Sequence, residues 1–123
     1  MPELCLGTAK LGLRRYGVGS TTAVDDIEVA NIFQAADDLR IAWVDTAQAY
    51  GDAEDWCWAY APKFFITKIL PQVTCHPDHR KRLFSDLIAQ SQSRLSVRPR
   101  VMLLHTENQI YDDVSVAAIR AVA

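Results

Sequence analysis

Four short apolar runs alternate with segments of helical pattern, and this alternation constrains the fold more than any other feature of the chain. The runs cover residues 4–8, 41–45, 64–69 and 101–104. Each run is largely apolar, which is typical of parallel strands that are covered on both faces. Because strands that alternate with helices form parallel sheets with right-handed crossovers, we expect an α/β fold of four βα units.

The helical segments are predicted from apolar spacing and from capping residues. The first opens near Thr22 or Asp25, either of which can cap free backbone N–H groups. A short helix is expected within 52–60, a longer one within 78–95, and the last starts near Asp112 or Asp113. The faces predicted to be buried carry Val29, Ile32, Phe33 and Ala36 in the first helix and Phe84, Leu87, Ile88 and Ser91 in the third.

Length and composition indicate one ordinary globular domain over residues 1–123. The formal net charge of −2 gives no strong attraction to nucleic acid or to an anionic membrane surface. No run reaches the ~18 apolar residues of a membrane span, and the N-terminus lacks a signal-peptide pattern. Cys5, Cys57 and Cys75 lack disulfide-framework spacing, so we expect a reducing cytoplasm and a core position for Cys5.

Polar side chains cluster where the predicted strands end. Asp45 ends the second run, Lys68 lies near the end of the third, and His105 follows the fourth. Tyr50 lies in the loop after the second run. The carboxyl ends of parallel strands meet at one edge, where (β/α) barrels hold their catalytic residues. The sequence therefore predicts a site of these four residues.

The chain resembles the aldo-keto reductases at the same positions. Its stretch Val44-Asp45-Thr46-Ala47-Gln48-Ala49-Tyr50-Gly51-Asp52-Ala53-Glu54 is similar to that family's signature Asp-Thr-Ala-x-x-Tyr-Gly-x-x-Glu. Residues 6–9, 66–68 and 103–105 resemble the family's first, third and fourth strands. The resemblance covers nearly all of this chain but only the first half of the family's (β/α)₈ barrel. It implies a half TIM barrel of four βα units, closed or covered by oligomerisation.

The resemblance implies that Asp45, Tyr50, Lys68 and His105 form a catalytic tetrad for carbonyl reduction that uses NADP. A tyrosine hydroxyl is a weak acid at neutral pH, and a nearby ammonium group stabilises the tyrosinate. Lys68 would take this role for Tyr50, and Asp45 would hold Lys68. His105 would bind and orient the oxygen of a small carbonyl substrate.

The same resemblance implies that Gly7, Thr8 and Asp45 contact the cofactor. In the family, the second half of the barrel supplies the other contacts to the nicotinamide and to the adenosine 2′-phosphate. These 123 residues hold no counterpart of those contacts. A half barrel also has two free strand edges and an apolar concave face, which favour pairing with another chain. We therefore expect a homodimer or a higher homo-oligomer.

Several interpretations stay open at the level of sequence. One interpretation is an NADP-dependent reductase that acts alone or is completed by a partner. The other is a non-catalytic oligomeric remnant or a small-molecule binder, in which the tetrad is idle. The chain is also consistent with a fragment of a longer protein.

Three further groups of residues contain possible metal ligands or phosphate-binding residues. For each group, a solvent-exposed or loop position is favoured over metal or phosphate binding. The groups are the five residues Cys75-His76-Pro77-Asp78-His79, the glycines Gly12, Gly17 and Gly19, and the pair Arg14 and Arg15.

Overall fold

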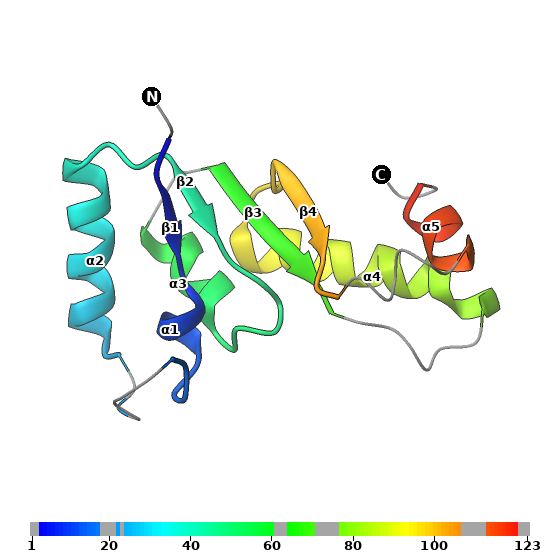
Figure 1. The fold of residues 1–123 in the computed structure, drawn as a ribbon, viewed down its shortest axis with the longest axis horizontal. Coiled ribbons are helices and arrows are strands. Elements are labelled where there is room, and N and C mark those ends of the chain that lie inside the picture. The colour runs from blue at the N-terminus through cyan, green and yellow to red at the C-terminus, as the bar shows by residue number, and fades with distance from the viewer. Residues whose placement is uncertain are drawn as a thin grey trace.

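The computed structural model describes residues 3–17, 22, 24–60, 64–70, 77–106 and 113–120 (Figure 1). Strands and helices alternate along these residues as the sequence predicts, with one additional short helix. In chain order they are β1 (Cys5–Gly7), α1 (Ala9–Gly12), α2 (Asp26–Asp38), β2 (Trp43–Asp45), α3 (Ala53–Tyr60), β3 (Phe64–Ile69), α4 (Pro77–Leu95), β4 (Val101–Leu104) and α5 (Asp113–Arg120).

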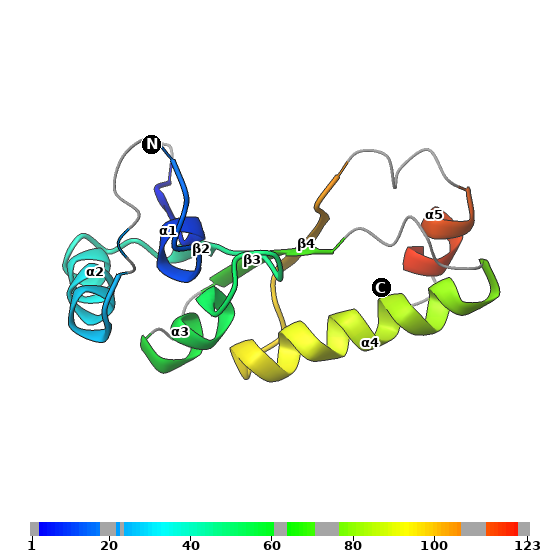
Figure 2. The same ribbon diagram turned by 90° about the horizontal axis from the view of Figure 1, so that it is seen from below.

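The four strands form one parallel sheet in the order β1-β2-β3-β4. The predicted α/β fold of four βα units is therefore confirmed. Figure 2 shows α2, α3 and α4 on one side of the sheet. In that view β1 and β4 bend away from these helices, so the sheet is concave on its other side. This one-sided arrangement is that of half a barrel.

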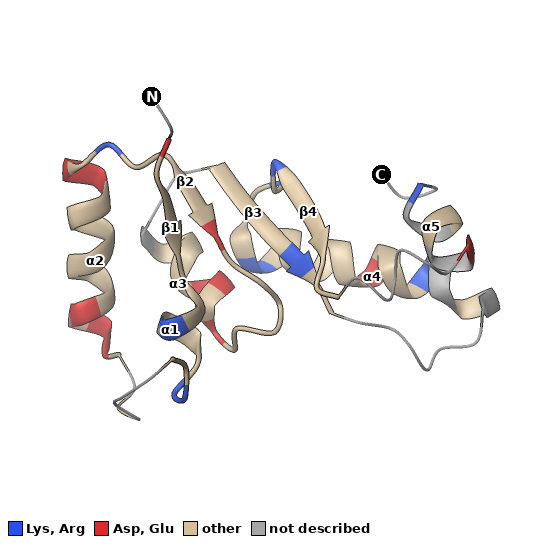
Figure 3. Cartoon of the chain, in the orientation of Figure 1, with Lys and Arg blue, Asp and Glu red and all other residues tan. Residues whose placement is uncertain are grey.

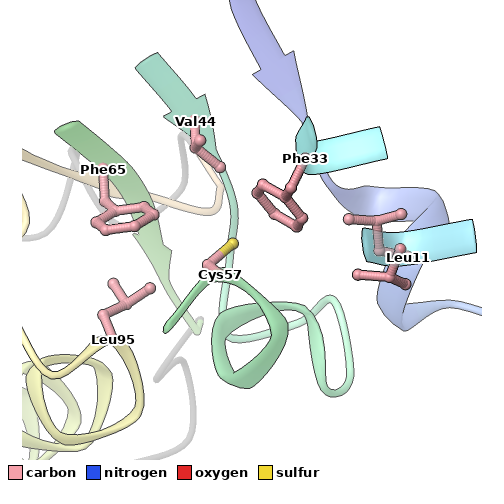
Figure 4. Close-up of a cluster of buried hydrophobic side chains, with 7 residues drawn as sticks. Leu11, Phe33, Val44, Cys57, Phe65 and Leu95 are labelled. Carbon is pink, nitrogen blue, oxygen red and sulfur yellow. The ribbon is translucent and has the colours of Figure 1, made fainter. Parts of the chain in front are cut away.

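The hydrophobic core lies between the sheet and its helices. Val44 of β2 and Phe65 of β3 are buried there against Phe33 of α2 and Leu95 of α4 (Figure 4). A second cluster joins Ile69 of β3 to Phe84 of α4. The faces predicted to be buried on the first and third helices do pack against these clusters.

The concave side of the sheet carries apolar side chains that solvent reaches. Phe64 and Leu103 are each 43% exposed, and Val101 is 38% exposed. Cys5 is also exposed, so its predicted core position is wrong. Side chains alternate between the two faces of a strand, and those of Cys5 and Phe64 lie on the face without helices. An apolar sequence run does not distinguish these two faces.

The predicted bounds of β3 and β4 agree with the structure, whereas β1 and β2 are shorter than predicted. Asp25 caps α2 through a capping box, in which its side chain accepts from the Glu28 N–H and its own N–H donates to the Glu28 carboxylate. Among the helices of the described residues, none has the length and apolar character needed to cross a membrane.

Candidate active site

An ion pair joins the carboxyl ends of β2 and β3. Lys68 Nζ lies 2.6 Å from Asp45 Oδ1 and donates a second hydrogen bond, of 3.2 Å, to the Thr46 carbonyl oxygen. The side chains of Lys68 and Asp45 are 19% and 35% exposed, so the pair is partly shielded from water. Figure 3 shows the acidic end of β2 beside the basic end of β3. A partly shielded pair of this kind holds the ammonium group in one place.

Tyr50 and His105 complete the predicted group of four residues. Lys68 Nζ lies 5.1 Å from the centre of the Tyr50 ring, within the range of a cation–π interaction. The rings of Tyr50 and His105 meet edge to face, with centroids 6.2 Å apart. The backbone N–H of His105 donates to the Ile69 carbonyl at 3.1 Å, which continues the β3–β4 pairing beyond β4. The structure therefore brings all four predicted residues together at one edge of the sheet.

The Nδ1 atom of His105 is buried and has no hydrogen-bond partner among the described residues. Buried polar atoms are normally paired, so an unpaired one calls for an explanation, such as a functional role or an ordered water. This atom lies on the ring that contacts Tyr50. His105 is therefore packed against the tyrosine with one ring nitrogen unpaired among the described residues.

The loop that carries Tyr50 is held by close contact with α1. The Tyr50 N–H donates to the Ala47 carbonyl at 3.0 Å, and the Tyr50 carbonyl accepts from the Ala53 N–H at 3.1 Å. A Cβ atom on Gly12 would lie 1.5 Å from the Tyr50 carbonyl oxygen, so only glycine fits there. Gly51 has a φ of 58°, a backbone conformation that favours glycine. Both glycines therefore position the tyrosine.

The three residues predicted to contact a cofactor lie at adjacent ends of β1 and β2. Gly7 pairs in register with Asp45, and a Cβ atom on Gly7 would meet no atom of the described residues within 4 Å. The concave side of the sheet is therefore uncrowded at Gly7 by the part of the chain that the structure describes. Thr8 is fully buried, and both its N–H and its hydroxyl donate to the Asp45 carbonyl at 3.0 Å. In this structure Thr8 fixes the backbone of Asp45.

A buried polar network lies behind the site, on the helix side of the sheet, and sequence reasoning missed it. Glu54 is fully buried, and its Oε1 accepts hydrogen bonds from Thr67 at 2.7 Å and from Ser91 at 2.8 Å. Its Oε2 lies 3.6 Å from Arg94 Nη1. The sequence signal for this network was Ser91, a polar residue on a helix face predicted to be buried.

Gln48 extends this network to the loop between Asp45 and Tyr50. Its side-chain amide donates to the Leu87 carbonyl at 2.6 Å and to the Ser91 hydroxyl at 2.9 Å, and its Oε1 accepts from the Leu70 N–H at 3.0 Å. Its backbone N–H donates to the Lys68 carbonyl at 3.2 Å. One side chain therefore links β2, β3 and α4 directly behind the tetrad.

Arg94 joins α4 to the end of the same loop. It contacts Asp55 at 2.6 Å and donates to the Gly51 carbonyl at 2.7 Å. The hydrogen bonds with Asp55 raise the pKa of Arg94, and the nearby Asp55, Glu54 and Asp52 charges act in the same direction. The guanidinium group is therefore charged at all physiological pH values.

Some of the groups considered in the sequence fall wholly or partly outside the described residues. These are Gly19, Cys75 and His76, and the side chains of Pro77 and Asp78. Arg14 and Arg15 are exposed. In the part of the chain that the structure describes, no three potential metal ligands lie together.

Comparison with known proteins gives matches among solved structures alone, since no family model and no curated protein matches the chain. One matched structure, from Pseudomonas aeruginosa, is described as a "putative aldo-keto reductase" and superposes with a TM-score of 0.68 at 27% identity. A second, with the same description and source, has a TM-score of 0.67 at 26% identity. Each match covers 95% of this chain but only 50% and 49% of the solved chains. The four parallel βα units therefore match half of such a protein.

Proposed function

We propose that this chain carries the carbonyl-reducing site of an aldo-keto reductase, with NADPH as the hydride donor. The observation that supports this most directly is the geometry around Lys68. Its ammonium group is fixed 2.6 Å from Asp45 and lies 5.1 Å from the Tyr50 ring centre, with His105 against the same tyrosine. The similarity to two solved structures with this description supports the same proposal.

Each residue has a role that follows from its chemistry. Tyr50 donates its hydroxyl proton to the substrate oxygen as that oxygen gains negative charge. Lys68 stabilises the phenolate that remains, because an opposite charge nearby favours the ionised form. Asp45 keeps the ammonium group in place through their ion pair. His105, whose ring meets that of Tyr50 edge to face, orients the carbonyl oxygen toward the tyrosine.

The cofactor NADPH supplies a hydride when it is bound. Gly7 offers open space beside Asp45 at the end of β1, and the exposed part of the Asp45 side chain lies next to it. These residues suit the nicotinamide end of the cofactor. In the family that the chain resembles, the contacts to the adenosine phosphate come from the second half of the barrel, so the proposal for this chain concerns the nicotinamide end alone.

The proposal is tested by titrating the protein with NADPH while following tryptophan fluorescence, and then by measuring NADPH oxidation with a set of aldehydes. Tyr50→Phe is expected to retain binding and to lower turnover by about 10²–10⁴-fold, the usual contribution of a positioned general acid. Lys68→Met is expected to lower turnover as well. Tyr16→Phe is the matched control, because Tyr16 is 54% exposed and is not one of the four proposed residues.

Absence of quenching up to millimolar NADPH would contradict a reductase that works with these residues alone. Turnover that Tyr50→Phe leaves unchanged would contradict the assigned proton donor. The first result would favour the second function class, a non-catalytic small-molecule binder in which the tetrad is idle.

A further inference from the structure

The concave side of the sheet carries a continuous apolar surface, which we call the open face. Its members alternate along the strands with residues that face the helices and are buried in β2 and β3 and partly buried in β1 and β4. They are Cys5, Trp43, Phe64, Ile66, Val101 and Leu103. Trp43 and Phe64 pack together on it, with ring centroids 5.3 Å apart. Large exposed apolar surfaces on a soluble domain mark places where another element binds.

Two strand edges border the open face. The order β1-β2-β3-β4 leaves one edge of β1 and one edge of β4 without a partner strand among the described residues. Free edges offer unpaired N–H and C=O groups to a further strand. All four strands run in the same direction, so a copy rotated by two-fold symmetry about that direction presents its β4 to β1 in parallel orientation.

The charges around the open face fit a second copy of the same surface. At its carboxyl end Asp45 and Lys68 neutralise each other, so two copies meet without net repulsion. At the other end Glu3 lies two residues before β1, and Arg100 lies directly before β4. When β1 of one copy runs beside β4 of another, these opposite charges lie at the same end of the seam. Both side chains are exposed. The Glu3 carboxylate accepts a hydrogen bond from the Trp43 indole, and the Arg100 guanidinium lies over the Phe64 ring.

The solved structures indicate the size of the element that covers such a face. The chain matches 50% of one solved structure and 49% of the other, so the matched half is accompanied by a similar length of further chain in both. We propose that two copies of this chain close an eight-stranded barrel, in which β1 of each copy pairs with β4 of the other. The two Asp45–Lys68 pairs then lie at the same end of one barrel.

The test is analytical ultracentrifugation of the 123-residue chain over a range of micromolar concentrations, without cofactor. We expect a dimer whose dissociation constant rises at least tenfold in Leu103→Lys, which places an unpaired charge on the open face. Leu39→Lys is the matched control, because Leu39 is 70% exposed and lies just after α2, away from the open face. Circular dichroism verifies that each variant is folded.

A charge exchange tests the proposed seam. Glu3→Lys and Arg100→Glu should each weaken the dimer, because each brings like charges together, and the double variant should restore it. A chain that is monomeric throughout, or a dimer that tolerates Leu103→Lys, would overturn the proposal. A double variant that dimerises no more tightly than the single variants would also overturn the proposal. None of these results depends on NADPH binding, so the dimer and the proposed function are tested separately.

Discussion

At the scale of single residues, the buried carboxylate of Glu54 depends on Arg94. Glu54 is fully buried, and the Arg94 guanidinium lies 3.6 Å from its Oε2. Removing one partner of a shielded ion pair leaves an uncompensated charge, which typically costs about 3–5 kcal/mol. Because Arg94 is 23% exposed, we expect Arg94→Met to lower the free energy of unfolding by about 2–3 kcal/mol. Urea denaturation measures this loss.

The control for Arg94 is Arg82, another arginine of α4. Its side chain is 89% exposed and lies 3.9 Å from Asp86, so Arg82→Met should change stability by no more than about 0.5 kcal/mol. The raised pKa of Arg94 gives the sign of the pH effect. The contribution of Arg94 to the free energy of unfolding is fully present below the ordinary pKa of arginine, and it is lost only as the pH rises above that value. Equal losses in the two variants would contradict this role.

At the scale of elements, α1 holds the Tyr50 loop through Gly12. A Cβ atom on Gly12 would meet the Tyr50 carbonyl oxygen at 1.5 Å and the Ala53 nitrogen at 2.8 Å. These atoms belong to the backbone, so relief requires α1 and α3 to separate. Overpacking of this kind costs about 1–3 kcal/mol, and Gly12→Ala should shift the urea midpoint accordingly. It should also disturb the NMR signals of the Tyr50 and His105 rings.

Gly7→Ala is the matched control for this prediction. The same substitution at Gly7 would place a Cβ atom in open space, so the urea midpoint should stay within error or rise slightly. If both glycine variants behave alike, close packing of α1 does not position the tyrosine.

The elements also show what the sequence can and cannot predict. The bounds of β3 and β4 follow from short apolar runs, and α2 begins where Asp25 caps it. Helix α1 was not predicted because a single turn ending in glycine has little intrinsic helical tendency, and its position depends on contact with Gly51. The network around Glu54 was missed because it joins residues that are 13 to 43 positions apart in the chain.

Three of the four residues of the candidate site were predictable from the order of the strands. Asp45, Lys68 and His105 lie where consecutive strands end, so parallel topology alone brings them to one edge. Tyr50 is different, because it lies in a loop whose course depends on Gly12 and Gly51. The family signature identified it, whereas periodicity did not. The catalytic roles of all four residues stay predictions that the kinetic test addresses.

At the scale of the whole molecule, the two described cysteines distinguish the free half barrel from the closed dimer. Cys5 is exposed on the open face. The pKa of its thiol is raised, first by the partial burial of the thiol and second by the nearby Asp45 charge. Cys57 is buried in the core, and burial raises its pKa to about 12. Only the thiolate reacts with alkylating reagents, so at pH 8 Cys57 is ionised in roughly one molecule in ten thousand.

In a Cys75→Ser variant, we expect iodoacetamide to label Cys5 faster at low protein concentration than above the dissociation constant of the dimer. Closure of the barrel turns the thiol inward, where the reagent no longer reaches it. Cys57 should react slowly at every concentration, which separates protection by assembly from a general change in the reagent. Peptide mass spectrometry assigns each label. A Cys5 rate constant independent of protein concentration, in a sample that sediments as a dimer, would mean that the two copies associate through another surface and leave the concave side of the sheet open.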